Sequence, residues 1–320
     1  MFHYADPPVL LRDVIEDPAA VETIFAAGAP YTPLGGWYRP GNEGGEARSP
    51  MWFQGDWVHD GLHVEGSDLF LHHERVIQAS REFYDAEVVV PHSIYVNLMA
   101  AMEECGPAHT DNPFFAGRNR TNTPMFLLRT MLWSGLFESW VIPQATSIWW
   151  MNDVEGGGLA YWGEGPSKPP QRHFGNMANT ALVGDNHGMF HQVESVGPFD
   201  RGTILVPASA ELAPADDATG DWTVRHGGGE LFRAPFDGYR ASVLWKADVF
   251  RDEAEQQRLS EDQLSMEDVA RIFNEDLARR GESLRLDLET LEQPETITAL
   301  AAIYPEDVPV GKGRSIFDAA

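Results

Sequence analysis

Cysteine is almost absent from this sequence, which has a single one at position 105 among 320 residues. One thiol cannot form an intrachain disulfide, and it cannot supply the several thiolates of a cysteine-based zinc site. Free cysteine is among the residue types most often buried, so we expect Cys105 to be a small buried residue at the end of a strand. Any metal site in this chain therefore has to use histidine and carboxylate ligands.

Long apolar runs and a leader sequence are also lacking. No stretch approaches the roughly 18 apolar residues that are needed to cross a bilayer. The first residues, MFHYADPPVLLRDVIEDP, lack the basic segment followed by an apolar one that marks a secretory signal. These two absences lead us to expect a cytoplasmic protein without a membrane anchor.

Basic residues are scarce, with 23 Lys and Arg against 49 Asp and Glu and a formal net charge of −26 at pH 7. Such a field repels phosphate backbones and anionic lipid, so neither nucleic acid nor a membrane surface is an expected partner. A local basic pocket for a small anionic molecule is compatible with this charge, and a small-molecule substrate is the expected partner. Composition leaves the oligomeric state open.

The apolar content of 43% and the aromatic content of 11% are those of a folded protein with a large core. We expect one domain over residues 1–320, built from three regions. Residues 1–86 predict an extension of helices and loops, in which the Gly- and Pro-rich segment 35–66 forms loops with short strands. Residues 87–250 predict many short strands separated by Gly, Pro, Asn or Asp, which is typical of a sandwich or barrel.

Residues 251–320 predict helices again. Ser265 and Asp268 resemble a capping box at a helix start, and Gly281 follows the last turn of the same helix. An apolar stripe runs between them with helical spacing, as is typical of a helix packed on a core. Its residues are Met266, Val269, Ile272, Phe273 and Leu277.

The segment PAHTDNPFF contains the strongest candidate for chemistry, because His109 and Asp111 are two residues apart after a probable strand. At a strand end, residues i and i+2 point to the same side, so an imidazole and a carboxylate can bind one ion there. Two histidines and one carboxylate on one face of an octahedron leave three positions open, which is the ligand set of Fe(II) sites that activate O2. Two other His-x-Glu matches, His63 to Glu65 and His72 to Glu74, lie in a loop and a probable helix, where the geometry is less suitable.

The third ligand is expected on a later strand, and the segment GDNHGMFHQVES offers two histidines. His191 lies in an alternating segment of which one face must be buried. His187 lies between Asn186 and Gly188, where a turn is the simpler interpretation. The predicted metal ligands are therefore His109, Asp111 and His191.

The order of these motifs resembles that of the 2-oxoglutarate- and Fe(II)-dependent oxygenase superfamily. A strand leads into His-x-Asp, a helix follows, and then come WWMNDVEGGGLAYW and GMFHQVESVG. The Asn-Asp-x-x-Gly-Gly segment resembles the turn into an inner strand of that family, and Phe-His-x-Val-x-x-x-Gly resembles its distal-ligand strand. The resemblance covers about residues 87–250. It implies a mainly β fold, a double-stranded β-helix (a jelly roll, cupin-like) with helical N- and C-terminal extensions.

The same resemblance implies a basic residue that holds the far carboxylate of 2-oxoglutarate, and two arginines compete for this role. Arg240 opens the strong strand YRASVLWKADVF, and its Arg-x-Ser, with Ser242, resembles a family motif in which the Ser assists the same carboxylate. This choice requires an insertion near residues 207–235. Arg201 has a common family separation from His191 but lies in a probable turn. Arg is suited to this task because its planar fork engages a carboxylate through two hydrogen bonds.

Several other side chains are possible contacts of 2-oxoglutarate or substrate, although ordinary packing is the simpler role for each. We include Asn97 among the residues that are predicted to contact the co-substrate 2-oxoglutarate. The others are Tyr95, Thr146, Trp149, Trp150, Tyr161 and Trp162.

The activity that the resemblance implies is oxidation of a small-molecule metabolite with Fe(II), 2-oxoglutarate and O2, with release of succinate and CO2. Hydroxylation is the expected outcome, and desaturation or ring formation would use the same ligands. Two alternatives remain: a cupin-like metalloenzyme that does not use 2-oxoglutarate, and a ligand-binding jelly roll without catalysis.

Overall fold

The computed structural model describes residues 2–34, 48–103, 105–291 and 293–309. Its helices are α1 (Ala19–Ala27), α2 (Asp68–Leu71), α3 (Glu74–Tyr84), α4 (Met125–Ser134), α5 (Glu253–Glu261), α6 (Met266–Arg280) and α7 (Pro294–Ile303). Its 3-10 turns are η1 (Glu138–Trp140), η2 (Phe199–Arg201) and η3 (Phe236–Gly238). Its strands are β1 (Val9–Arg12), β2 (Thr32–Pro33), β3 (Arg48–Pro50), β4 (Trp52–His59), β5 (Leu62–His63), β6 (Val88–Met99), β7 (Phe114–Phe115), β8 (Val141–Ile142), β9 (Gln144–Trp150), β10 (Leu159–Trp162), β11 (Gln171–His173), β12 (Thr180–Gly184), β13 (Phe190–Val193), β14 (Leu205–Pro207), β15 (Glu211–Pro214), β16 (Asp221–His226), β17 (Gly229–Pro235) and β18 (Arg240–Phe250).

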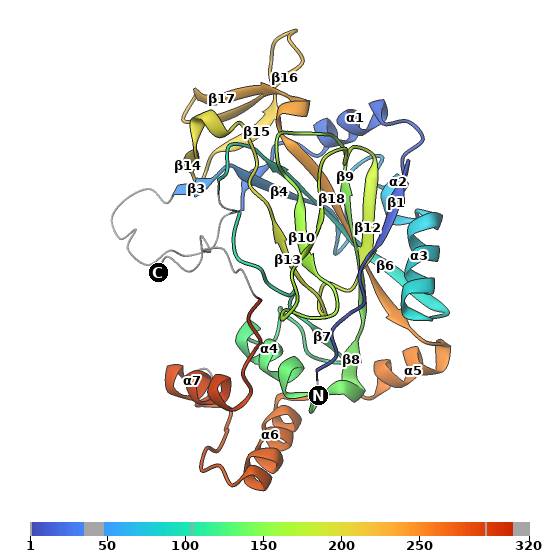
Figure 1. The fold of residues 1–320 in the computed structure, drawn as a ribbon, viewed down its shortest axis with the longest axis vertical. Helices are drawn as coiled ribbons and strands as arrows, with labels where there is room; N and C mark the ends of the chain where they lie inside the picture. Colours follow the sequence, from blue (N-terminus) through green and yellow to red (C-terminus); the bar gives the residue numbers. More distant parts are fainter. Residues whose placement is uncertain (1, 35–47, 104, 292, 310–320) are drawn as a thin grey trace.

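A large antiparallel sheet forms the centre of the molecule (Figure 1). Its strand order is β1-β12-β9-β18-β6-β4-β2, with β5 paired to β4. The long strand β18 lies in the middle and is paired along its length with β6 on one side and with β9 on the other. A strand with neighbours on both sides has its backbone hydrogen bonds satisfied, so β18 is a rigid support for side chains on its two faces.

A smaller sheet with the order β11-β10-β13 packs against the central one. The segment between β6 and β7 runs along its free edge through the bridges Met102↔Val196 and His109↔His191. Successive segments from β6 to β18 alternate between the two sheets. The strands β6, β9, β12 and β18 belong to the large sheet, whereas β10, β11 and β13 form the small one, and Met102 and His109 are bridged to residues at its edge. This winding of one chain between two facing sheets is the double-stranded β-helix, and the expected fold is confirmed.

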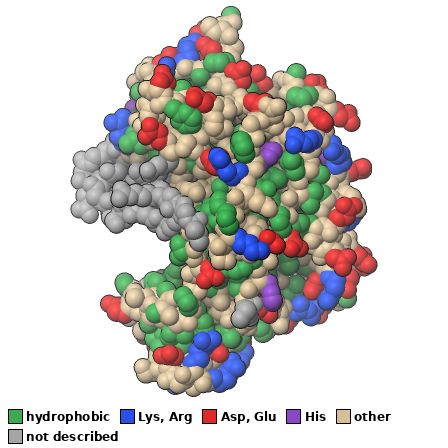
Figure 2. Space-filling view, in the orientation of Figure 1, with side chains coloured by type: hydrophobic (Ala, Val, Ile, Leu, Met, Phe, Trp, Pro, Cys, Tyr) green, Lys and Arg blue, Asp and Glu red, His purple; other side chains and the backbone are tan. Residues whose placement is uncertain are grey.

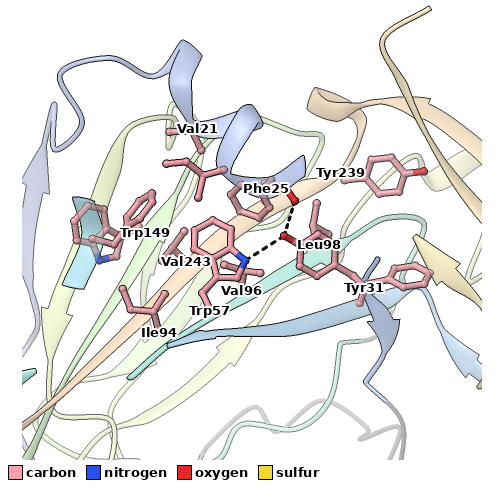
Figure 3. Packing of buried hydrophobic residues seen from close by; sticks show 14 of the residues in the cluster. Val21, Phe25, Tyr31, Trp57, Ile94, Val96, Leu98, Trp149, Tyr239 and Val243 are labelled. Carbon is pink, nitrogen blue, oxygen red and sulfur yellow. Dashed lines mark hydrogen bonds between the residues drawn. The ribbon is translucent and has the colours of Figure 1, made fainter. Parts of the chain in front are cut away.

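The two faces of the large sheet carry different residues, as the alternation along a strand requires. Val243 and Trp245 of β18 belong to a core that includes residues of α1, α2 and α3, so these helices cover the outer face. Figure 3 shows the aromatic centre of this core, in which the Trp57 indole donates to the Tyr31 hydroxyl, which donates to the carbonyl of Phe25. Leu244, between Val243 and Trp245, packs with residues of the small sheet instead. The inner face therefore includes Leu244 and the residues two and four positions from it on β18.

The helices α4, α6 and α7 pack together and form a separate core below the sheets in Figure 1. The predicted capping box is present, because the Ser265 hydroxyl accepts from the Asp268 amide and the Asp268 carboxylate accepts from the Ser265 amide. Gly281 ends α6 at a φ of +77°, a conformation that favours glycine. Within the part of the chain that the structure describes, no helix is long and apolar enough to span a membrane.

The expectation for residues 1–86 needs a correction, and the structure adds detail on the region near 207–235. Residues 1–86 are not only helices and loops, because β1 pairs with β12 and β4 pairs with β6 in the large sheet. The prediction for the segment 35–66 lies partly outside the described residues, at 35–47. In the region near 207–235, where an insertion is expected, β15, β16 and β17 form a separate three-stranded sheet at the top of Figure 1, and the insertion itself stays a prediction.

Candidate metal site

The two predicted histidine ligands lie side by side because their backbones pair. The His109 amide donates to the His191 carbonyl at 3.0 Å, and the His191 amide donates to the His109 carbonyl at 2.9 Å. This pairing brings the imidazole rings to 4.6 Å between centroids. The Asp111 amide donates to the Asn186 carbonyl at 2.8 Å, which ties Asp111 to the turn before β13.

One ligand atom from each of His109, Asp111 and His191 lies within 4.8 Å of the others. Among the described residues this is the one group of three or more such side chains that could hold a metal ion. The sequence predicts these three residues from the His-x-Asp spacing and the strand context, and the folded chain brings them together. His63, by contrast, lies in the hairpin strand β5 next to Asp68, and His72 and His73 separate α2 from α3.

Both imidazoles are oriented by backbone carbonyls. Nδ1 of His109 lies 3.0 Å from the Pro107 carbonyl, and Nδ1 of His191 lies 3.2 Å from the Met189 carbonyl. Because a carbonyl only accepts, these contacts place the proton on Nδ1 and leave the Nε2 lone pair available for a metal. Together with the Asp111 carboxylate this gives two nitrogens and one oxygen, a donor set that suits Fe(II).

The charges around this group favour the ionisation states that bind metal. Burial opposes the charge on Asp111, but Lys246 and the neighbouring histidines outweigh burial and hold its pKa well below the usual range. Burial and the proximity of His109 lower the pKa of His191 to about 4, so this imidazole is neutral at pH 7. Protons therefore do not compete with a divalent cation for these atoms at neutral pH.

Lys246 is a site residue that the sequence analysis missed. Its ammonium lies 2.6 Å from Oδ2 of Asp111, and both side chains are largely buried. A signal for it exists in the sequence: Lys246 shares the inner face of β18 with Arg240, six residues earlier, and only three lysines occur in the whole chain. Because side chains alternate along a strand, the even spacing between Arg240 and Lys246 predicts that both side chains lie on the same face.

His187, the alternative distal histidine, lies outside the group of three. Its side chain is buried, and neither ring nitrogen has a hydrogen-bond partner among the described residues. Burial and the cation of Lys246 lower its pKa to about 3. His187 is thus a neutral imidazole beside the site and stacks on Phe114.

Arg240 lies on the same inner face of β18 and is only 2% exposed. Its Nε donates to the Gly157 carbonyl at 2.7 Å, and its Nη1 donates to the Ser242 hydroxyl at 2.9 Å. Gly157 has a φ of +70°, and a Cβ there would lie 2.9 Å from Val154 and 3.0 Å from the Arg240 side chain, so this turn favours glycine. Burial lowers the pKa of Arg240 to about 10, so it remains a cation at pH 7, and no described carboxylate pairs with it. An unpaired buried cation is costly, so this residue fits an anionic ligand.

No protein-family profile and no curated protein matches the sequence, but solved structures do match in fold. An oxidoreductase of the 2OG-Fe(II) oxygenase family from Burkholderia pseudomallei aligns over 77% of this chain and 85% of its own, at 12% identity and a TM-score of 0.43. A Pseudomonas putida prolyl-4-hydroxylase aligns over 77% of this chain and 94% of its own, at 9% identity and a TM-score of 0.37. A non-haem α-ketoglutarate-dependent carbocyclase, SnoK from nogalamycin biosynthesis, aligns over 81% and 89%, at 12% identity and a TM-score of 0.40.

The chain is similar to these three structures at sequence identities of 9% to 12% and TM-scores of 0.37 to 0.43. Similarity at this level does not assign an activity, and the residues of the site have to carry that assignment.

The remaining predicted residues are placed differently. Arg201 ends the exposed turn η2, where its guanidinium lies 5.4 Å from the Phe232 ring of β17, so the fold does not bring it to the inner face. Asn97 lies opposite Ser242 on β6, and its side-chain oxygen accepts from Trp52 and Gln54.

Cys105 is buried as expected and packs with Met99, Met102 and Val196, and the sulfur of Met99 accepts from Nη1 of Arg240 at 3.7 Å. It therefore lies near the Arg240 end of the inner space.

The other candidate residues lie in different packing clusters. Tyr95, Trp150 and Tyr161 pack in the inner cluster, whereas Trp149 and Trp162 belong to other cores.

Proposed function

We propose that this protein is an Fe(II)- and 2-oxoglutarate-dependent oxygenase that oxidises, by hydroxylation in the first place, a small-molecule metabolite. The observation that carries the proposal is the pairing of two features on the inner faces of one double-stranded β-helix. One is a group of two histidines and one carboxylate, and the other is a buried arginine without a carboxylate partner among the described residues.

His109, Asp111 and His191 would hold the metal, and Arg240 with Ser242 would hold the far carboxylate of 2-oxoglutarate. Fe(II) with 2-oxoglutarate supplies the activation of O2, with release of succinate and CO2, when both are bound. The protein's own contribution is position and charge. It fixes the imidazole tautomers through Pro107 and Met189 and directs the anionic co-substrate toward the buried guanidinium.

The spacing on β18 suits a ligand that extends between the two features. Lys246, which contacts Asp111, is six residues from Arg240, so their Cα atoms are roughly 20 Å apart at about 3.4 Å per residue. Both side chains are long and shorten this span. A five-carbon dicarboxylate, bound to the metal by one end and to Arg240 by the other, is of a suitable length, whereas a monocarboxylate would leave the arginine unpaired.

The charges of the site point in the same direction. Lys246 neutralises Asp111, so a bound Fe(II) would keep its two positive charges and Arg240 would add a third. A dianionic co-substrate would therefore meet local attraction although the chain as a whole carries −26. A site without 2-oxoglutarate, or a jelly roll that only binds ligands, would give Arg240 no such partner.

The test is anaerobic loading with Fe(II), followed by addition of 2-oxoglutarate and O2 and measurement of bound iron and released succinate. The wild-type protein should bind one iron and release succinate. His109→Ala, Asp111→Ala and His191→Ala should each lose iron and turnover by at least about 10²-fold while their thermal melts remain cooperative.

His63→Ala is the matched control, because His63 begins a His-x-Glu tripeptide of the same spacing outside the group of three. It should behave as wild type, and His187→Ala should retain iron. Iron binding without succinate release would favour the cupin-like alternative. No iron binding at all would favour the ligand-binding jelly roll.

A further inference from the structure

The pair formed by Lys246 and Asp111 is the contact from which a further role can be inferred, and that role rests on the proposed function. Nζ of Lys246 lies 2.6 Å from Oδ2 of Asp111, whereas Oδ1 of the same carboxylate lies 3.6 Å from Nε2 of His191. The two carboxylate oxygens thus have different partners. Oδ1 faces Nε2 of His191, and Oδ2 faces the ammonium of Lys246.

The regular alternation of β18 places Lys246 on the inner face, and a local irregularity of the neighbouring strand β6 lies beside it. In the pairing of β18 with β6, Lys246 is opposite Ser93 while Ala247 is opposite Pro91, so His92 is an extra residue on β6. Such a bulge bends the strands and changes the direction of the neighbouring side chains, and bulges are common beside active sites. On its other side Lys246 is opposite Thr146 in a regular ladder with β9, which fixes its position along the strand.

Stability is a poor explanation for this pair. Two opposite charges that are removed from water gain little net free energy, and hydrophobic residues of similar volume often replace such pairs without loss. A function at the metal site is the better explanation.

We propose that Lys246 is a positioning residue that holds Oδ2 of Asp111 and thereby makes Asp111 a ligand through Oδ1 alone. A carboxylate whose two oxygens are both free can chelate a cation and occupy two coordination positions. With two histidines, a chelating Asp111 would leave two open positions instead of three. The keto and near-carboxylate oxygens of 2-oxoglutarate need two, so no position would remain for O2, or 2-oxoglutarate would have to compete with Asp111. Lys246 prevents this competition.

The test is a pair of titrations on protein loaded with Mn(II), which binds without redox chemistry. Calorimetry first measures Mn(II) affinity and then 2-oxoglutarate affinity of the Mn(II) protein, for wild type, Lys246→Met and Lys246→Arg. In Lys246→Met the 2-oxoglutarate affinity should fall about 10- to 100-fold, the range typical of residues that orient metal ligands. Its Mn(II) affinity should stay within about threefold of wild type or become tighter, because a cation beside the metal has been removed.

Lys246→Arg keeps a cationic donor to Oδ2 and should restore 2-oxoglutarate affinity to within about threefold of wild type. Lys168→Met is the matched control, because Lys168 also pairs with a carboxylate, Glu164 at 2.9 Å, but is an exposed i,i+4 pair away from the site. It should leave both affinities unchanged. A thermal melt of each loaded variant shows whether the fold is intact.

Unchanged 2-oxoglutarate affinity in Lys246→Met would overturn the positioning role. A parallel loss of Mn(II) affinity, 2-oxoglutarate affinity and melting temperature in both Lys246 variants would overturn it as well, because a merely structural pair behaves in this way. If wild type bound neither Mn(II) nor 2-oxoglutarate, the proposed function itself would be wrong, and that result differs from a wild type that binds both.

Discussion

Arg240 is buried, positively charged and held by three hydrogen bonds, which leave Nη2 without a partner among the described residues. Nε and Nη1 donate to Gly157 and Ser242, and the ring of Trp150 lies 5.4 Å from the guanidinium carbon. These contacts fix the plane of the fork before any ligand arrives, so little side-chain entropy is lost when a carboxylate binds. An exposed arginine such as Arg201 has no comparable preorganisation.

Replacing Arg240 by Ala should therefore weaken 2-oxoglutarate and leave the metal in place. Loss of a buried, charge-assisted pair costs about 2–4 kcal/mol, which corresponds to a factor of roughly 30 to 1000 in affinity. Calorimetric titration of the metal-loaded variant with 2-oxoglutarate measures the loss. Arg201→Ala is the control and should bind as wild type; a large loss in Arg201→Ala with none in Arg240→Ala would transfer the anchor to Arg201.

Among the elements, β18 links the packing of the fold to the chemistry of the site. Its outer residues Val243 and Trp245 are completely buried in the main core, and its inner residues Arg240, Ser242 and Lys246 supply the polar groups. Because side chains alternate along a strand, one rigid strand serves both purposes. A displacement of β18 by one residue would exchange the two sets and destroy both the core and the site.

The helix α6 supports the lower core of α4 and α7, and its stability depends on a local cap. Ser265→Ala removes the hydroxyl that accepts from the Asp268 amide, and it should lower the free energy of unfolding by about 1 kcal/mol. Urea unfolding followed by circular dichroism measures this. Ser260→Ala is the control, because the Ser260 hydroxyl is exposed and donates only to the Gln257 carbonyl within α5. Equal stability of the two variants would contradict a role for the cap.

At the scale of the molecule, the acidic surface determines which partners can approach. Figure 2 shows Asp and Glu side chains spread around the outline of one face, with Lys and Arg among them. The 49 acidic residues exceed the 23 basic ones, so the field outside the protein is negative and decays over about 10 Å at 0.1 M salt. The attraction that we propose for an anionic co-substrate is confined to the inner space around Arg240 and the metal site.

Duplex DNA should consequently fail to bind. Fluorescence anisotropy with a labelled duplex of about 20 base pairs, in about 50 mM salt, should show no change up to about 10 µM protein, because non-specific affinity depends on phosphate contacts with Lys and Arg. Binding that weakened steeply with added salt would reveal a basic surface and contradict this prediction.

A cytoplasmic location stays a prediction from the sequence.

The sequence alone determined the local features of this protein. Strand-forming segments between turn residues predicted the β core, and the cap at Ser265 and the glycine at Gly281 predicted the bounds of α6. The proposed metal ligands were also accessible, because the His-x-Asp spacing at a strand end and the resemblance of GMFHQVESVG select them. Such signals are short-range, and the physical rules behind them, side-chain alternation and the unsatisfied groups of helix ends, act within a few residues.

The tertiary structure decided what depends on contacts between distant segments. It placed Arg240 on the inner face and Arg201 on an exposed turn, added β1 and β4 to the large sheet, and paired Lys246 with Asp111 across 135 positions of the chain. Strand register and burial settle these points, and both arise only when the whole chain packs. A lysine in a strand has no local mark that distinguishes a surface residue from one that holds a proposed metal ligand, because the difference lies in its distant neighbours.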